Sequence, residues 1–189
     1  AGEKLNKLVD ALLNISRLTN HTLAVEPIKS SLPKLIDESL KRYQSALAAR
    51  HFTVRTSYPD KLADISLDPD IIHFLLERLL DNAAAYGAEN GTLKATLEST
   101  ARGVVISIAT PGANITKTDQ VKLFTNLYRG EAAQKNQPAG TGLSLFLLKQ
   151  ICDYIGADIT YRGNTKQNIF SVTLPKAGMS KQPGTRKLS

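Results

Sequence analysis

The sequence predicts an α+β domain in which helices and strands alternate along most of the chain. Three long stretches have the apolar spacing of amphipathic or buried helices, within residues 31–47, 69–86 and 142–156. Shorter stretches between and after them alternate apolar with polar residues, as strands do. With 189 residues, of which 42% are hydrophobic, the chain is long enough to bury one core and to carry a small appendage.

The first element is predicted to be a helix that ends near Thr19 and Asn20. Its apolar residues follow alternating three- and four-residue steps, at Leu5, Leu8, Leu12 and Ile15. This stripe is typical of a helix that pairs with another helix, and equally of an amphipathic helix that lies on its own domain. Residues 22–26 then have the pattern of a short strand, and Pro27 begins a turn.

The second helix is predicted to start after Ser30 or Ser31, because either side chain can cap it and Pro33 suits the first turn. One apolar face runs along it, at Leu35, Ile36, Leu40, Tyr43 and Leu47. Residues 51–58 follow as an alternating strand that ends before Pro59.

The clearest helix start in the sequence is at Asp68 and Pro69. The aspartate can accept hydrogen bonds from the free amides of the first turn, and proline is favoured at the first helical position. The long helix that follows is predicted to end at about Tyr86. A hairpin comes next, with strands at residues 93–97 and 104–108.

A polar stretch at residues 111–141 contains only one short helical pattern, around 119–127. An irregular stretch of this length inside a compact domain is usually a functional lid or is mobile. A helix at 142–156 and strands at 158–162 and 168–174 are predicted to close the domain.

Charge and composition narrow the possible function classes. The net charge of +7 allows an anionic partner, but four basic residues and no acid lie in the last 14 residues, so 176–189 are expected to form a disordered basic tail. Cys152 lies in an apolar run and is interpreted as a buried side chain, and three scattered histidines give no metal-ligand spacing. No apolar run approaches the roughly 18 residues of a membrane-spanning helix, so we expect this chain to be soluble and cytoplasmic.

Four segments in a fixed order carry the candidate chemistry. They are residues 78–87 (RLLDNAAAYG), 108–115 (IATPGANI), 121–130 (VKLFTNLYRG) and 140–146 (GTGLSLF). In this order and spacing they resemble the N, G1, F and G2 boxes of the catalytic domain of sensor histidine kinases, which belongs to the GHKL ATPase superfamily. The resemblance implies a GHKL or Bergerat-type α/β sandwich, with a mixed sheet, three main helices on one face and a preceding N-terminal helix.

The same resemblance implies a site for ATP and Mg²⁺. Asn82 has a neutral side chain with a hard oxygen, which can complete the octahedral shell of Mg²⁺ bound to nucleotide phosphates. Tyr86 shares a helix face with it and can stack on adenine, and Arg78 either meets a phosphate or solvates its helix face. The other nucleotide contacts implied by the resemblance are Thr110, Gly112, Phe124, Arg129, Gly140, Thr141, Gly142 and Leu143.

Several positions depart from the family pattern. Thr110 stands where the family has an aspartate that accepts a hydrogen bond from the adenine amino group, and a hydroxyl accepts this bond without the charge that strengthens it. Asn114 and Ser144 replace glycines of the G1 and G2 boxes, and Ala85 replaces a basic residue. These departures favour an alternative, in which the domain is degenerate, binds nucleotide weakly or not at all, and acts by docking.

The resemblance also divides the chain and implies its partners. Residues 1–20 are expected to be the second helix of the dimerisation hairpin, 21–175 the catalytic domain and 176–189 the tail. The phosphoaccepting histidine is expected outside this chain, and the expected partners are its own or a partner subunit's hairpin, a response regulator and a second copy in a homodimer. The full-length protein is expected to be a membrane-bound sensor. A nucleic-acid-binding module is the remote alternative, and we expect no nucleic acid partner because the charge lies mainly in the tail.

Overall fold

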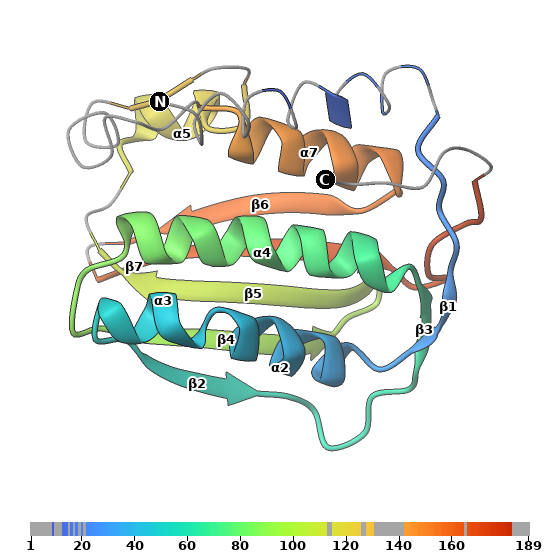
Figure 1. Ribbon diagram of the computed structural model, residues 1–189, viewed down its shortest axis with the longest axis horizontal. Helices are drawn as coiled ribbons and strands as arrows, with labels where there is room; N and C mark the ends of the chain where they lie inside the picture. The colour runs from blue at the N-terminus through green and yellow to red at the C-terminus, as the bar shows by residue number, and fades with distance from the viewer. Residues whose placement is uncertain are drawn as a thin grey trace.

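The computed structural model describes residues 9, 13, 14, 16, 18, 20, 22–112, 115–125, 128–130, 142–164 and 166–182. A five-stranded sheet forms one layer, and the main helices lie side by side on one of its faces (Figure 1). These helices are α2 (Leu32–Arg42), α4 (Pro69–Tyr86) and α7 (Ser144–Tyr154). The arrangement confirms the predicted α+β sandwich.

The sheet is mixed, as the resemblance implied. Its strands lie in the order β2 (Thr53–Ser57), β4 (Thr92–Ser99), β5 (Gly103–Pro111), β7 (Gln167–Pro175) and β6 (Asp158–Gly163). The β2–β4 pair is parallel and the other pairs are antiparallel. Alternate residues of the central strands are buried beneath the helices: Leu93, Ala95, Leu97, Val104, Ile106, Ile108, Val172 and Leu174.

The start of α4 confirms the clearest helix signal. Asp68 is 1% exposed, and its carboxylate accepts hydrogen bonds from the amides of Asp70 at 3.1 Å and Ile71 at 3.5 Å. Its other oxygen accepts from the Glu26 amide at 2.8 Å, which ties the helix start to the segment before β1 (Ile28–Ser30). One side chain therefore caps the central helix and fixes a distant segment to it.

The predicted second helix is interrupted. α2 ends at Arg42, the backbone of Tyr43 is not helical, and α3 (Gln44–Ala49) continues toward β2. The apolar spacing continues through the break, because Leu47 is still buried at 1% exposure. Periodicity therefore predicted one helix where the chain forms two.

Two short strands differ from the prediction. Residues 22–26 form no strand, since Val25 makes only an isolated bridge to Gln182, and β1 begins after Pro27 instead. β1 pairs antiparallel with β3 (Ile65–Leu67), a strand that was not predicted. Three residues give too few alternating positions for a pattern, so only the pairing of distant segments defines these strands.

The first part of the predicted disordered tail is folded. Met179 is 4% exposed, and its amide donates to the Ser66 carbonyl at 2.8 Å. Gln182 forms backbone hydrogen bonds with Val25, and its side chain donates to the Tyr154 carbonyl. The expectation of disorder is therefore wrong for residues 176–182, whose low apolar content concealed the anchor at Met179. Residues 183–189 lie outside the described part of the chain.

Part of the predicted N-terminal helix is described. Asn14 and Leu18 are helical and buried, whereas Val9 and Leu13 are helical and exposed, so the helix contacts the domain along one side. The predicted apolar stripe lies outside the described residues, at Leu5, Leu8, Leu12 and Ile15. The assignment of residues 1–20 to a dimerisation hairpin stays a prediction. No helix in the described part of the chain has the length and apolar character needed to cross a membrane.

Candidate functional site

The predicted N-box residues lie on one face of the C-terminal half of α4. Arg78, Asn82 and Tyr86 are four residues apart on this helix, so their side chains share a stripe. This half of α4 lies at the same end of the molecule as α5 (Lys117–Lys122) and the first turn of α7 (Figure 1). Three of the four sequence boxes therefore contribute elements to one end of the helical layer.

Arg78 is held mainly by its own helix. Its guanidinium lies 4.9 Å from the centroid of the Phe74 ring, and its Nη1 lies 3.7 Å from Asp81 Oδ2. A partly exposed ion pair of this length contributes little free energy. The Arg78 Nε is buried and has no hydrogen-bond partner among the described residues, so this side chain retains a donor for a ligand.

Asn82 provides the strongest indication of a ligand site. Its Nδ2 is buried and has no hydrogen-bond partner in the described part of the chain, which costs free energy unless a ligand or water satisfies it. A 180° rotation of the amide exchanges Nδ2 with Oδ1, so the same position can present the oxygen that Mg²⁺ requires. The described residues contain no cluster of three or more His, Cys, Asp or Glu side chains that could hold a metal. A single amide oxygen at Asn82 fits a metal ion whose other ligands come from nucleotide phosphates.

The end of α4 is fixed against the end of β5. The Ala88 amide donates a hydrogen bond to the Pro111 carbonyl at 2.8 Å. Gly112 follows at a close approach, where the Cβ of any other residue would lie 3.4 Å from the Tyr86 carbonyl oxygen and 3.2 Å from Asn168 Nδ2. Residues of the predicted N and G1 boxes are therefore adjacent in space.

Thr110 lies beside two residues that sequence reasoning missed. It is 7% exposed and pairs across the sheet with Asn168. Asn168 Oδ1 accepts a hydrogen bond from the Tyr161 hydroxyl at 2.5 Å, and that hydroxyl accepts from the Ile115 amide at 3.3 Å. Burial raises the pKa of Tyr161, while the Ile115 contact lowers it. The raised pKa keeps the Tyr161 proton in place as a donor to Asn168.

The pair formed by Thr110 and Asn168 contains no carboxylate. At the place where the family has an aspartate, this chain therefore presents a hydroxyl beside an amide, and both groups are neutral. A polar residue at a core-facing position was the available signal for Asn168. The register between β5 and β7, which identifies its neighbour, cannot be read from either segment alone.

The segment after Gly112 is partly described. α5 is shorter than the helical pattern predicted at 119–127, and the Tyr128 hydroxyl donates to the Asp119 carboxylate on it. Phe124 is half-buried and packs against the core, which agrees both with a lid anchor and with an ordinary core residue. Arg129 is half-buried next to Tyr128.

The start of α7 supplies a further unsatisfied group, in addition to those on α4. Gly142 has φ +74°, a left-handed conformation that favours glycine, and Leu143 is 2% exposed directly before the helix. The Ser144 Oγ is buried and has no hydrogen-bond partner among the residues described. A helix N-terminus also favours an anion through its free amides and its dipole. The predicted contacts Gly140 and Thr141, and the altered position Asn114, lie outside the described residues.

The fold and the arrangement of these boxes define a GHKL-type ATP-binding domain. Residues 67–178 match the family described as histidine kinase-, DNA gyrase B-, and HSP90-like ATPase. The chain belongs to this family, and it is an ATP-binding domain of the kind found in sensor histidine kinases.

Two curated relatives are sensor kinases. Sensor histidine kinase YcbM of Bacillus subtilis is 22% identical over 174 residues, which cover 92% of this chain and 56% of YcbM. Adaptive-response sensory kinase SasA of a Nostoc species is 32% identical over 142 residues, which cover 75% of this chain and 35% of SasA. The chain therefore spans only about a third to a half of the length of these relatives.

Solved structures share the fold. Full-length ShkA in complex with AMPPNP superposes with a TM-score of 0.81 at 17% identity, over 96% of this chain and 38% of ShkA. Histidine kinase ThkA in complex with the response regulator protein TrrA superposes with a TM-score of 0.68 at 18% identity, over 91% of this chain and 49% of ThkA. At these identities the likeness establishes the fold alone.

Proposed function

We propose that this chain is the ATP-binding catalytic part of a sensor histidine kinase, which transfers the γ-phosphate of ATP to a histidine outside the chain. One observation carries the proposal. Two buried polar atoms without partners among the described residues, Asn82 Nδ2 and Ser144 Oγ, lie on α4 and α7, which pack together where the sequence boxes meet. The family match and the sensor-kinase relatives support the proposal.

In this site, the two unsatisfied groups have complementary roles. The Asn82 amide oxygen is a ligand of Mg²⁺, which, when bound, neutralises charge on the phosphates. The Ser144 hydroxyl and the amides at the start of α7 donate to phosphate oxygens, and Arg78 and Arg129 add positive charge. The other phosphate contacts proposed at this end are Gly140, Thr141, Gly142 and Leu143.

The base end of the site lies at the junction of α4 and β5. Tyr86 is 37% exposed and offers its ring for stacking, and Gly112 leaves room for the base beside it. The Thr110 hydroxyl accepts the hydrogen bond from the adenine amino group, and Phe124 anchors the lid. Because a neutral acceptor binds more weakly than a carboxylate, we expect a lower nucleotide affinity than a Thr110→Asp variant would have.

The remaining chemistry lies outside this chain. In phosphoryl transfer the protein contributes positioning and charge neutralisation, both of which this domain can supply. The attacking imidazole comes from the dimerisation hairpin of a homodimer, and a response regulator then receives the phosphoryl group. The names of the ShkA and ThkA structures include a nucleotide analogue and a response regulator, which supports the same ligand class and partner here. We further propose that the full-length protein is a membrane-bound sensor.

Calorimetric titration of the chain with Mg-ATP and Mg-ADP tests the proposal. We expect micromolar binding that Asn82→Ala weakens by at least about tenfold, because the variant lacks the metal ligand. Gln44→Ala is the matched control, since it removes an amide from an exposed position on α3, and it should bind like the unmodified chain.

Two further measurements make the test decisive. With EDTA present, the unmodified chain and Asn82→Ala should bind ATP equally, because Asn82 acts through the metal ion. No binding by the unmodified chain, together with binding gained in Thr110→Asp, would instead establish the degenerate docking domain and reject the kinase proposal.

A further inference from the structure

The face of the sheet opposite the helices has three chemically distinct rows of side chains. Strand pairing aligns a basic row at Arg162, Ile169, Ala109, Lys94 and Arg55. The next row consists only of hydroxyl side chains, at Thr160, Ser171, Ser107, Thr96 and Ser57. A third row has acids at its two ends, at Asp158, Thr173, Val105 and Glu98.

All three rows are open to solvent. Their members are exposed or half-buried, whereas the residues that alternate with them on the central strands are buried under the helices. In the middle of the hydroxyl row, the Oγ atoms of Ser107 and Ser171 lie 2.8 Å apart. The described structure therefore leaves one whole face of the sheet uncovered, with small side chains at its centre.

The charges on this face are separated along the strands. Lys94 and Glu98 are four residues apart on β4, and Arg162 and Asp158 are four residues apart on β6. At about 3.3 Å per residue, each pair is separated by about 13 Å, which is too far for an ion pair. None of these four side chains forms an ion pair with another described residue. Positive side chains therefore lie on one side of the hydroxyl row and negative side chains on the other, and both can pair with charges of another molecule.

We propose that this face binds the same face of a second copy of the chain. A two-fold axis along the hydroxyl row turns one sheet over onto the other and exchanges the basic row with the acidic row. Lys94 of each copy then faces Glu98 of the other, and Arg162 of each copy faces Asp158 of the other. The charge pattern is therefore complementary to itself, as an interface with this symmetry requires.

The size of the face determines the strength of this association. Five strands spaced about 4.8 Å apart, crossed by three rows, cover on the order of 400 Å² per copy, about half the area of a standard interface. The small central side chains allow the close approach of packed sheets, at about 10 Å. The dimer is therefore weak and depends on concentration and salt. It is independent of the proposed nucleotide site, which lies in the helical layer.

Sedimentation velocity of the whole chain over a concentration series tests this proposal. We expect a monomer–dimer equilibrium that weakens between about 50 mM and about 300 mM NaCl, because the facing charges are screened. Lys94→Glu and Glu98→Lys each place like charges opposite one another and should weaken dimerisation at least about tenfold. Arg55→Glu is the matched control: it reverses a charge in the same basic row, on an edge strand with no acid opposite, and should leave dimerisation unchanged.

Mixing the two charge-reversal variants gives the sharpest result. Equal amounts of Lys94→Glu and Glu98→Lys should form a heterodimer, because the two glutamates of one variant then each face a lysine of the other. The double variant, which keeps the net charge, should dimerise like the unmodified chain. A chain that stays monomeric at all concentrations would overturn the proposal. So would a dimer that both single variants leave intact, because its interface would lie elsewhere, such as on the N-terminal helix.

Discussion

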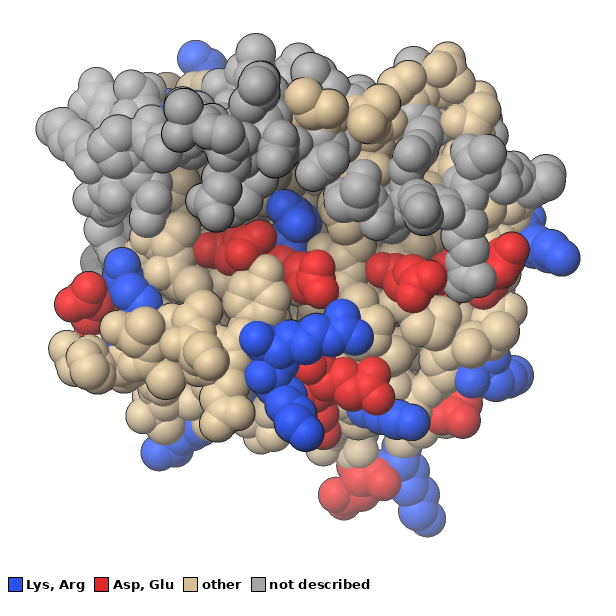
Figure 2. Space-filling model, in the orientation of Figure 1, with Lys and Arg blue, Asp and Glu red and all other residues tan. Residues whose placement is uncertain are grey.

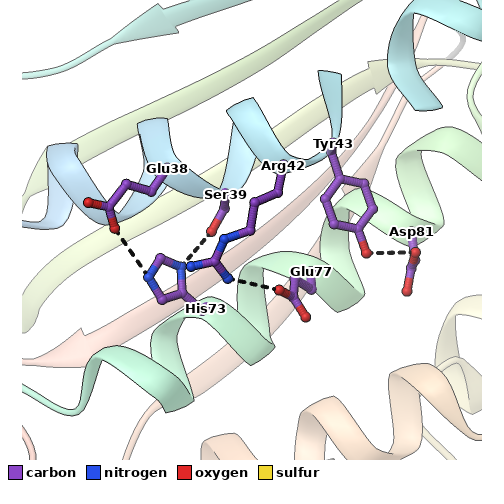
Figure 3. Close-up of polar contacts among 7 residues, drawn as sticks. All are labelled: Glu38, Ser39, Arg42, Tyr43, His73, Glu77 and Asp81. Atoms are coloured by element: carbon purple, nitrogen blue, oxygen red, sulfur yellow. Dashed lines mark hydrogen bonds and ion pairs between the residues drawn. The ribbon is translucent and has the colours of Figure 1, made fainter. Parts of the chain in front are cut away.

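The two sides of α4 differ in how their buried polar groups are satisfied. Toward α2, the Ser39 Oγ lies 2.9 Å from His73 Nδ1, and His73 Nε2 lies 3.3 Å from Glu38 Oε2 (Figure 3). The Arg42–Glu77 ion pair and the Tyr43–Asp81 hydrogen bond also join these two helices. We call this set of polar contacts between α2 and α4 the α2 seam. On the side of Arg78 and Asn82, by contrast, polar atoms of α4 and α7 are buried without partners among the described residues.

This contrast distinguishes polar groups that stabilise the fold from polar groups that we propose bind a ligand. Burial and the hydrogen bond to Asp81 raise the pKa of Tyr43 above its usual value, so its hydroxyl stays protonated and acts as a donor. Figure 2 shows acidic and basic side chains close together over the middle of this face, rather than a patch of one sign. The polar groups between α2 and α4 are therefore satisfied by one another, whereas those on the other side of α4 have no partner among the described residues. In the proposed function, a bound nucleotide supplies the missing partners.

The largest stability effect is expected at Asp68, which caps the N-terminus of α4. Asp68→Ala removes the helix cap and leaves the Glu26 amide without its acceptor, so we expect a loss of about 3 kcal/mol in the free energy of unfolding. Chemical denaturation measures this loss. Asp68→Asn keeps an acceptor oxygen and should lose clearly less. Equal losses in the two variants would show that the effect comes from the negative charge and not from the hydrogen bonds.

The features that were predicted correctly from the sequence depend on residues close together in the chain. The Asp68–Pro69 start and the stripe of Arg78, Asn82 and Tyr86 depend on residues within one helix, and both are present as predicted. The failed prediction for residues 22–26 and the unpredicted strand β3 depend instead on pairing between distant segments.

The candidate site shows the same division. Asn82 and Gly112 were predicted from motifs, and the structure brings the N-box helix end beside Gly112. Asn168 and Tyr161 were missed, because only the register of β7 against β5 and β6 places them beside Thr110. Sequence patterns can therefore identify the groups of a binding site, but not the neighbours that long-range strand pairing supplies.

A smaller loss of stability is expected when a hydrogen bond of the α2 seam is removed, and no loss when an exposed serine is replaced. Ser39 is fully buried, and Ser39→Ala leaves His73 Nδ1 without a partner, so we expect a loss of about 1 to 2 kcal/mol in unfolding free energy. Ser45→Ala is the control, since Ser45 is exposed on α3. If the two variants unfold at the same denaturant concentration, the seam contributes no more than a solvated surface does.

The pH dependence of stability should show the contribution of His73, which belongs to the α2 seam. Burial lowers the pKa of His73 below its usual value of 6.5 and Arg42 adds to this shift, while Glu38, Glu77 and Asp70 oppose it. The unfolded chain therefore binds this proton at a higher pH than the folded protein does, and stability is lost as pH falls below about 6.5.

Denaturation midpoints at about pH 7.5 and about pH 5 measure this effect. His73→Gln should reduce the loss of stability between the two values, whereas His51→Asn, at an exposed position after α3, should leave it unchanged. Identical pH dependence in the unmodified chain and in His73→Gln would assign the loss to other groups.

The smallest stability effect is expected on the unsatisfied side, at Ser144. Its hydroxyl has no partner among the described residues, so Ser144→Ala removes a buried polar atom without breaking a hydrogen bond. The free energy of unfolding should therefore change by less than about 0.5 kcal/mol, or increase slightly, in contrast to Ser39→Ala. Because we propose that this hydroxyl donates to a phosphate oxygen, the same variant should also weaken Mg-ATP binding several-fold. A clear loss of stability with unchanged binding would place Ser144 among the structural groups and remove the difference between the two sides of α4.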